Sequence, residues 1–311
     1  MWNEYTALLT NRTLHNYAVA GAVSSNNRLF NSTFMFIEVP SLLDQIDHYL
    51  KSKSRVEDPE NALVNIEIGS NNLLMSLNKD DDDDDDDDDG DDKDVDYVDA
   101  NQDRIASVTV KNIINGAQRL VDEGGFSQFL VWNIPPLWKA PTFNIGGKNR
   151  VEKKRKVVES VVTKINRLLE IEFNKFISNN HKKLKFAMIH DFHRMFKMLL
   201  QPNVVRELGI TDTTTNCVDI EIHILDSYWK ECPNRQHHFF LDTVHPTAKV
   251  HYTIGALVER VIATSSQNYD EEFIIDVIRW YGIRDASFKN NIVVKSGVKN
   301  EPGFKNFFLL E

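Results

Sequence analysis

The sequence has only two cysteines in 311 residues, and it has no long apolar run. Two cysteines exclude a disulfide-scaffold protein and give no framework for a zinc or iron–sulfur site. No segment approaches the roughly 20 consecutive apolar residues that a membrane-spanning helix needs. Residues 1–5 show neither the basic nor the apolar region of a signal peptide. With 9 prolines and 13 glycines, the composition also excludes collagen-like and wholly disordered chains.

The remaining composition is that of a globular protein, with 41% hydrophobic and 26% charged residues, which fits one large α/β domain. The net charge of the chain is −10, and residues 80–99, with fifteen Asp and one Lys, carry −14 of it. The rest of the chain therefore has a net charge of −10 + 14 = +4. The unbroken run Asp80–Asp89 repels itself and cannot bury apolar surface. We therefore expect a disordered insertion over residues 79–104. Calcium binding is the alternative, but a calcium loop needs ligands spaced along a fixed turn.

Short apolar segments alternate with amphipathic helical patterns along most of the chain. The predicted strands are Leu14–Val19, Leu63–Ile68, Phe129–Ile134 and Phe186–Ile189, and the predicted helices are 108–123, 151–177 and one after Pro246. Strands that alternate with helices form a parallel sheet covered on both faces. Ligands of such sheets bind beyond the carboxyl ends of the strands, so functional residues are expected there.

Residues 266–311 fit this alternation poorly. They contain a helical pattern around Phe273–Tyr281 and two short apolar segments, but no motif. We therefore separate a domain over residues 1–265 from a C-terminal extension over residues 266–311, to which the sequence assigns no role.

The clearest local signal for chemistry is the sequence Asp-Thr-Val-His-Pro-Thr at residues 242–247. Pro246 disfavours helical backbone at His245, so the imidazole is expected on an extended loop. Asp242 can fold back and accept the Nδ1 proton, which leaves Nε2 as a general base. Thr247 can cap the helix that follows. The alternative is a structural histidine at a helix start.

Two predicted strands end in turns that contain glycine or asparagine. Residues 16–22 read Asn-Tyr-Ala-Val-Ala-Gly-Ala, and Gly21 allows the backbone to approach a ligand and donate its N–H. Residues 66–72 read Ile-Glu-Ile-Gly-Ser-Asn-Asn, and an asparagine amide can donate to a developing oxyanion, at a value of ~3 kcal/mol in acyl transfer. Taken separately, each block is more simply an ordinary turn between a strand and a helix.

In combination and in order, these blocks resemble a GDSL-type esterase/lipase of the SGNH hydrolase superfamily, over about residues 2–263. The family's second, third and fifth blocks correspond to Asn16–Ala22, Ile68–Asn72 and Asp242–Pro246. The segment Phe129–Leu137 is similar to the strand and diproline of the secreted fungal and plant branches, and residues 39–45 and 189–192 match connecting segments.

The resemblance implies a three-layer α/β/α fold with a flavodoxin-like parallel sheet. It implies ester hydrolysis through an acyl-serine, without a cofactor or a metal. Position by position, Gly21 and Asn71 are two of the three oxyanion donors, His245 is the general base, and Asp242 orients it. The implied partner is a small-molecule or polymer-borne carboxylic ester, with contact to a lipid interface.

The family's first block, Gly-Asp-Ser-Leu, is absent from this sequence. Its serine is the nucleophile and its N–H is the remaining oxyanion donor, and its place lies before Met1. Ser24 and Ser25 follow the second block and have no reason to be activated, and no Gly-x-Ser-x-Gly motif occurs. We predict a truncated and inactive hydrolase. The alternative is a non-catalytic pseudo-esterase that binds ligands and has lost the serine.

The absent block also ends the first strand of the family's sheet, which lies between the strands of the second and third blocks. Without it, backbone groups of both neighbours are unpaired in a buried place, at about 1–3 kcal/mol each. We therefore expect a gap between the strands that begin at Leu14 and Leu63. This cost favours a truncated sequence over a stable protein that discarded the strand.

Cys217 and Cys232 enclose a loop just before the Asp242–His245 segment. Secreted branches of the family often have a disulfide there, and such a bridge stabilises by ~3 kcal/mol. Two separate buried thiols are the alternative. The resemblance and this pair predict an extracellular protein, and glycosylation sequons begin at Asn11 and Asn31.

Basic clusters occur at Lys148–Lys156 and Lys182–Lys185. Nucleic-acid binding would require interleaved aromatic residues or a recognisable module, and the sequence has neither. We therefore predict no nucleic-acid partner and interpret the first cluster as the solvated face of a helix.

Overall fold

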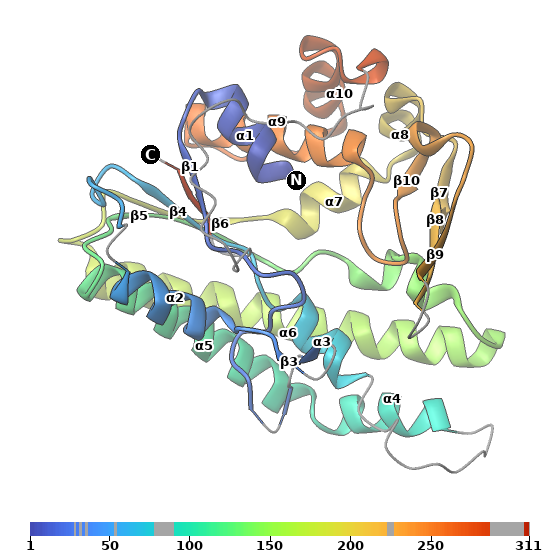
Figure 1. Cartoon of the computed structure of the whole chain (residues 1–311), viewed down its shortest axis with the longest axis horizontal. Helices are drawn as coiled ribbons and strands as arrows, with labels where there is room; N and C mark the ends of the chain where they lie inside the picture. Colours follow the sequence, from blue (N-terminus) through green and yellow to red (C-terminus); the bar gives the residue numbers. More distant parts are fainter. Residues whose placement is uncertain are drawn as a thin grey trace. The chain divides into compact units, whose positions relative to one another are not determined.

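A computed structural model describes residues 1–27, 29–30, 33–34, 37–52, 55–77, 90–222, 227–286 and 308–310. The chain forms two compact units, each assembled from segments that are distant in sequence (Figure 1). Unit 1 consists of Met1–Arg12, Pro136–Val151 and His193–Ser296, and unit 2 consists of Thr13–Pro135, Glu152–Phe192 and Gly297–Glu311.

Unit 2 contains a five-stranded sheet in the order β1-β11-β4-β5-β6. Its strands are β1 (Leu14–Asn16), β4 (Leu63–Ile66), β5 (Gln128–Trp132), β6 (Phe186–His190) and β11 (Phe308–Leu310). The strands β4, β5 and β6 pair in parallel, whereas β11 pairs antiparallel with both β1 and β4. The strand β1 therefore runs in the same direction as β4. This arrangement confirms the predicted α/β class with a parallel sheet.

The helices of unit 2 bury apolar faces in close contact with one another and with the sheet. They are α2 (Leu42–Lys51), α3 (Ser70–Ser76), α4 (Gly90–Ala100), α5 (Gln102–Asp122) and α6 (Lys148–Asn180). Two further short strands, β2 (Thr33–Phe34) and β3 (Ile37–Glu38), pair antiparallel. A Cβ atom at Gly116 of α5 would lie 2.7 Å from Cδ1 of Ile46 in α2, so any larger residue would require the Ile46 side chain to move. The ring of Phe129 in β5 meets that of Phe176 in α6 edge to face at 5.8 Å.

Both helices predicted from the apolar stripes of unit 2 are confirmed, and both are longer than predicted. The acidic insertion differs from its prediction, because α4 and the start of α5 lie within residues 79–104. Val95 and Val98 of α4 are buried, and this apolar pair three residues apart stabilises a helix in an otherwise charged segment. The run Asp80–Asp89 lies outside the described residues.

The middle of the sheet also differs from the prediction of a gap. The strand β11 lies between β1 and β4, with Leu310 opposite both Leu14 and Leu63. At its other end, Phe308 lies opposite Asn16 and Asn65. Backbone groups of β1 and β4 that would face an empty place are therefore paired with a strand from the C-terminal extension.

Unit 1 is built around the crossing of two helices. Its helices are α1 (Trp2–Thr10), α7 (Phe192–Leu199), α8 (Pro202–Leu208), α9 (Ala248–Thr264) and α10 (Glu271–Trp280), and its strands are β7 (Asp212–Asn216), β8 (Val218–Ile222), β9 (Ser227–Glu231) and β10 (His238–Phe240). A Cβ atom at Gly255 of α9 would lie 2.7 Å from the Trp2 carbonyl oxygen of α1. The hydroxyl of Thr6 donates to the Gly255 carbonyl at 3.1 Å. The two helix backbones therefore touch at this glycine.

Part of the predicted C-terminal extension packs against α8 and α9 of unit 1. The Arg279 guanidinium of α10 makes two bonds of 3.0 Å to the Glu207 carboxylate of α8. The buried Lys249 ammonium of α9 donates to the carbonyls of Leu208 and Arg284 at 2.9 and 3.1 Å. Residues 271–286 are therefore integrated into the same core as α9.

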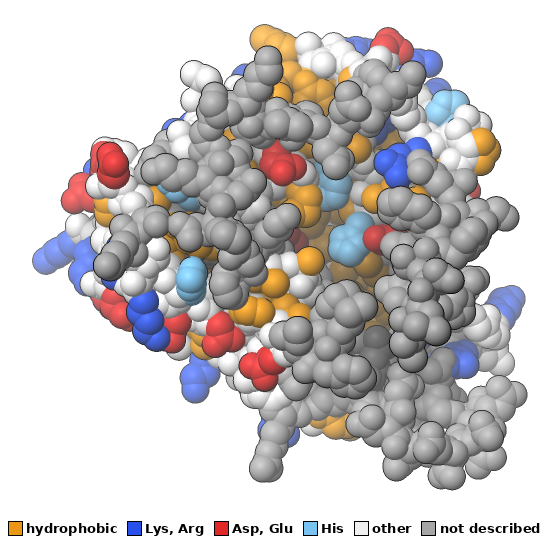
Figure 2. Space-filling model, in the orientation of Figure 1, with side chains coloured by type: hydrophobic (Ala, Val, Ile, Leu, Met, Phe, Trp, Pro, Cys, Tyr) orange, Lys and Arg blue, Asp and Glu red, His pale blue; other side chains and the backbone are white. Residues whose placement is uncertain are grey.

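The basic clusters lie among carboxylates. Within unit 2, Lys153 pairs with Asp96 at 3.0 Å and Lys183 pairs with Asp122 at 2.6 Å. Along the left edge of Figure 2, basic and acidic side chains are interspersed. None of the helices in the described part of the chain combines the length and hydropathy that crossing a bilayer requires.

Candidate active site

The Asp242 carboxylate holds His245 by its ring and by its backbone. The imidazole Nδ1 lies 2.8 Å from Oδ2 of Asp242, and the His245 backbone N–H donates to Oδ1 at 2.7 Å. The Val244 N–H donates to the same oxygen at 2.9 Å. Burial alone would raise the pKa of Asp242, but the bonds from His245 and Val244 outweigh it and lower this pKa. The carboxylate is therefore ionised at neutral pH and orients the ring through Nδ1.

The loop that carries this pair is closed by backbone hydrogen bonds between β10 and α9. The Leu241 N–H donates to the His245 carbonyl at 2.8 Å, and Phe240 bridges to Pro246. Thr247 is the N-cap residue of α9, as predicted, but its hydroxyl donates to the His238 carbonyl at 3.0 Å instead of capping the helix. The hydroxyl thereby ties the end of the loop to β10. The His245 side chain is 68% exposed, so much of the imidazole is open to solvent.

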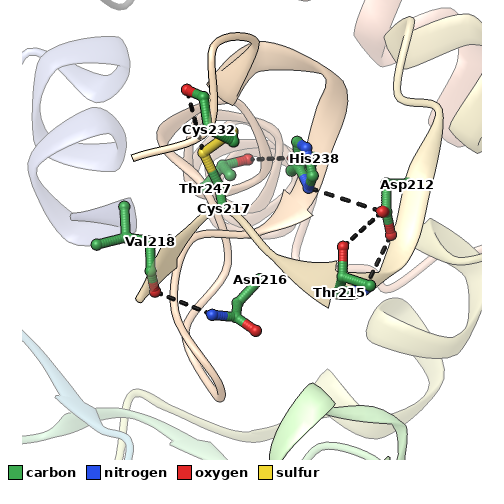
Figure 3. The surroundings of a disulfide bond; sticks show 8 residues. All are labelled: Asp212, Thr215, Asn216, Cys217, Val218, Cys232, His238 and Thr247. Carbon is green, nitrogen blue, oxygen red and sulfur yellow. Dashed lines mark hydrogen bonds and ion pairs between the residues drawn. A yellow bond between two sulfur atoms is a disulfide. The ribbon is translucent and has the colours of Figure 1, made fainter. Parts of the chain in front are cut away.

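A disulfide joins Cys217 to Cys232 next to this loop (Figure 3). The Cys217 N–H donates to the carbonyls of Phe240 and Leu241, and the Val218 N–H donates to the Leu241 carbonyl at 2.7 Å. The residue immediately before Asp242 is thus fixed to the bridged segment. The predicted pairing of the two cysteines is confirmed.

A second histidine–aspartate pair lies in the surroundings of the disulfide (Figure 3). The His238 Nδ1 is 3.9 Å from Asp212 Oδ2. Burial would raise the pKa of Asp212, but hydrogen bonds from Thr215 and Thr214 lower it to about 2. This carboxylate is engaged in holding the turn at the start of β7, so the pair has a structural role. It offers a matched comparison for Asp242 and His245.

In unit 2 the predicted oxyanion residues Gly21 and Asn71 are brought together. Gly21 has a φ of 81°, a left-handed conformation that strains other residues. Asn71 lies in the first turn of α3, and its side-chain amide donates to the Ala22 carbonyl at 3.0 Å. An amide nitrogen carries two hydrogens, so Asn71 can keep this bond and donate to a substrate oxygen. The two predicted turns are therefore in direct contact.

Asn72, the neighbour of Asn71, braces this contact from a fully buried position. Its carbonyl oxygen accepts the Ser24 N–H at 2.8 Å, and its amide donates at 2.8 Å to the hydroxyls of Ser24 and Thr109. The Asn112 amide also donates to the Ser24 hydroxyl, at 3.1 Å. Sequence reasoning missed Thr109 and Asn112, whose signal was only their polarity beside an apolar helical stripe.

Ser24 is completely buried, and its hydroxyl accepts hydrogen bonds from two asparagine amides. In the described part of unit 2, neither an imidazole nor a carboxylate is hydrogen-bonded to this hydroxyl. A serine without a base is not activated as a nucleophile. These contacts give Ser24 a part in holding the turn, and its exclusion as the nucleophile stays a prediction.

His251 lies on α9, six residues after His245. Burial, with smaller contributions from the Met1 amino group and His245, lowers its pKa to about 3, although Asp242 acts in the opposite direction. His251 is therefore neutral at physiological pH. Among the described residues, no group of three or more His, Cys, Asp or Glu side chains is arranged to hold a metal ion.

Comparison with known proteins gives two findings. The model of the GDSL-like lipase/acylhydrolase family matches residues 2–258. A thermolabile hemolysin of Vibrio parahaemolyticus is 22% identical over 290 residues, which cover 88% of this chain. The chain spans 56% of the length of that relative. Because the family model covers most of the residues, the chain belongs to the GDSL-like lipase/acylhydrolase family.

Proposed function

We propose that the complete protein is a carboxylic ester hydrolase that reacts through an acyl-serine. His245 takes the proton of the nucleophile and returns it to the leaving alcohol. Asp242 orients the imidazole and stabilises the imidazolium that forms. The Gly21 N–H and the Asn71 amide donate to the oxyanion of the tetrahedral intermediate, where they lower the barrier most.

The observation that carries this proposal is the geometry of Asp242 and His245. A carboxylate fixed by two backbone N–H groups faces Nδ1 at 2.8 Å, while the imidazole side chain remains largely exposed. A histidine that served only to start a helix would need neither feature. The contact of Asn71 with the residue after Gly21 supports the oxyanion assignment independently.

We further propose that the 311-residue chain lacks the nucleophile and has no serine-dependent turnover by itself. This part rests on the absence of a Gly-Asp-Ser-Leu block from the sequence and on the structural role of Ser24. The alternative is a pseudo-esterase that binds esters without cleaving them. The contact between the turns of Gly21 and Asn71 is compatible with the hydrolase and with the binding protein. A measurement of ester hydrolysis is therefore needed to distinguish them.

The decisive experiment compares the 311-residue chain with a chain that includes the coding sequence upstream of Met1. A p-nitrophenyl ester and a fluorophosphonate probe report turnover and an activated serine. We expect neither signal from the 311-residue chain and both from the extended chain. If the transcript encodes no Gly-Asp-Ser-Leu block and the extended chain binds esters without cleaving them, the binding protein is the correct assignment.

The role of His245 is tested in the extended chain by His245→Ala, with His238→Ala as the matched control. The first substitution removes the proposed base, and turnover should fall at least 10³-fold with folding intact. The second removes a histidine that faces a carboxylate involved in a structural turn, so most activity should remain. Near-normal turnover of the His245→Ala variant would contradict the assignment.

The proposal requires His245 to approach Gly21 and Asn71 in the active protein. The chain has two cysteines, and both are in the disulfide, so a maleimide would label the cysteines introduced by mutation. Asn71→Cys and His245→Cys, placed in one chain, should be joined by a short bifunctional maleimide. Failure of the folded protein to crosslink would refute a shared site.

The substrate class is a carboxylic ester of a small molecule, a polymer or a lipid. The name of the relative, a hemolysin, supports including esters at lipid interfaces. The disulfide supports an extracellular location, because such bridges persist in oxidising compartments. A secretion assay that recovers the oxidised protein from the medium tests that location.

A further inference from the structure

The segment Ile145–Gly147 forms the tip of a loop in unit 1, between the 3-10 helix η2 (Pro141–Asn144) and α6. The Ile145 side chain is 67% exposed. A Cβ atom added at Gly147 would meet no heavy atom of the described residues within 4 Å beyond its chain neighbours, so the tip projects into open space. Gly146 has a φ of 115°, which lets the chain turn towards α6. Ile145 is therefore presented to solvent at a projecting turn.

The base of this loop is fixed to the loop that carries the proposed catalytic base. The Thr142 N–H donates to the Thr243 carbonyl at 2.9 Å. The Asn144 amide donates to the Thr214 carbonyl of β7 at 3.0 Å. Ile145 follows Thr142 by three residues, which span at most about 11 Å. A single exposed apolar side chain is ordinary on a protein surface, but this one is held beside the proposed catalytic loop.

The same loop carries an excess of positive charge. Residues 136–151 contain no Asp or Glu and three basic residues, which are Lys139, Lys148 and Arg150. Lys139 and Lys148 are both exposed, and neither forms an ion pair with a carboxylate of the described residues. Glu152, the first acidic residue after the tip, is paired with Lys156 at 2.7 Å. Because the whole chain has a net charge of −10, attraction to an anionic partner requires a local excess of cations such as this one.

We propose that this loop docks the protein on a lipid surface that carries anionic headgroups. Ile145 enters the boundary between headgroups and acyl chains, and Lys139 and Lys148 contact the headgroups. An exposed apolar tip flanked by exposed lysines matches the apolar and charged layers of such a surface. The proposal rests on the proposed function only for its purpose, which is to bring the ester group of a lipid to His245. Binding itself involves neither the nucleophile nor the sheet of unit 2.

The composition of the loop favours this partner over two others. A protein partner in an interface of standard size covers about 800 Å² on each side, which one projecting side chain and two lysines do not provide. A nucleic acid would bind the lysines through its phosphates but would gain nothing from an exposed isoleucine. Because the lipid contact consists of one apolar side chain and a few charges, it is weak, reversible and reduced by salt.

The first test measures binding of the 311-residue chain to vesicles by co-sedimentation. One set of vesicles contains phosphatidylcholine alone, and the other contains equal parts of phosphatidylcholine and phosphatidylglycerol. The chain should bind the anionic vesicles at least about tenfold more tightly than the neutral ones, and high salt should remove most of the difference. Equal binding to both sets, or no binding to either, would overturn the proposal.

The second test uses substitutions at exposed positions, with a matched control. Ile145→Ser should weaken binding to anionic vesicles about tenfold, because one inserted apolar side chain is lost. Leu8→Ser in α1 is the control, since Leu8 is another apolar residue of unit 1 that is 51% exposed, and it should leave binding unchanged. Lys148→Gln should weaken binding to anionic vesicles about fivefold and leave binding to neutral vesicles unchanged. Circular dichroism of each variant checks that it is folded.

Trp280 provides the competing outcome. Its side chain is 78% exposed, and tryptophan is favoured at lipid interfaces. If binding is weakened by Trp280→Ala or Leu8→Ser but not by Ile145→Ser, docking occurs elsewhere on the protein and the proposal is overturned. Selective losses in the Ile145→Ser and Lys148→Gln variants support it. Hydrolysis is not measured in these assays, so vesicle binding by a protein whose extended chain cleaves no ester would refute the proposed function alone.

Discussion

Asp242 Oδ1 accepts the backbone N–H of His245 at 2.7 Å, while Oδ2 of the same carboxylate lies 2.8 Å from Nδ1 of the His245 ring. One side chain thus fixes both the loop and the imidazole. Because the ring is oriented through Nδ1, Nε2 is directed away from the carboxylate. This double attachment makes the stability of the loop depend on the ionisation of Asp242.

Replacing this carboxylate by an amide should destabilise the protein in a pH-dependent way. The Asp242→Asn variant should lose about 1.5–3 kcal/mol at pH 7, the range for hydrogen bonds to charged groups. The folded-state pKa of Asp242 is lowered, so its contribution is present above the unfolded pKa and lost as pH falls through the folded value. Urea unfolding should show the difference at pH 7 and a much smaller one near pH 3. A difference independent of pH would contradict this prediction.

His251 should make the protein less stable as pH falls below the ordinary histidine range. Its pKa in the fold is about 3, against ~6.5 when unfolded. Between these values the unfolded state binds a proton that the folded state does not, which costs about 1.4 kcal/mol per pH unit. A His251→Gln variant should lose this dependence between pH 6.5 and 5, as measured by urea unfolding. The exposed His181→Gln variant should behave as the unmodified chain does.

Asn71 and Asn72 are adjacent, but their substitutions should differ: Asn72→Ala should mainly lower stability, and Asn71→Ala should mainly lower activity. Asn72→Ala removes three buried hydrogen bonds, so it should destabilise unit 2 by at least ~2 kcal/mol. Asn71→Ala removes one bond to the Ala22 carbonyl and should cost about 1 kcal/mol or less. In the extended chain Asn71→Ala should lower kcat about 10²–10³-fold. Urea unfolding and ester kinetics, measured on both variants, test these expectations. Equal losses of stability in the two variants would contradict the structural difference between Asn71 and Asn72.

Removing the disulfide should loosen the loop that carries His245. The double variant Cys217→Ser, Cys232→Ser should lose ~3 kcal/mol, the value for a loop of about 15 residues. Hydrogen exchange should also accelerate at the Val218 N–H, which donates to Leu241 next to Asp242. The α5 amides of unit 2 serve as the internal reference and should be unchanged. Unaltered exchange at Val218 would show that the bridge does not hold the loop.

Much of the sheet is predictable because its strands are short apolar runs bounded by turns. β4 begins at Leu63 and β6 at Phe186, as predicted. β1 is shorter than its apolar run, because the Asn16 side chain accepts the Ala18 N–H at 3.0 Å and turns the chain out of the sheet. Local hydrogen bonding by asparagine thus ended a strand that hydrophobicity alone would extend.

The features that sequence reasoning missed depend on contacts between distant residues. β11 pairs with strands nearly 300 and 250 residues away, and no local pattern encodes such pairing. The helix α4 had a signal in the spacing of Val95 and Val98, but the density of aspartates concealed it. In the candidate site, the spacing of Asp242 and His245 is local and was predictable, whereas the bond between Asn112 and Ser24 joins residues 88 positions apart.

The contact of α1 with α9 at Gly255 affects how this protein is best prepared for experiments. The helix that follows His245 rests directly on the backbone of residues 2–6, so shortening the N-terminus would uncover it. Preparations should therefore keep residues 2–6 intact, because α9 depends on their backbone for its packing.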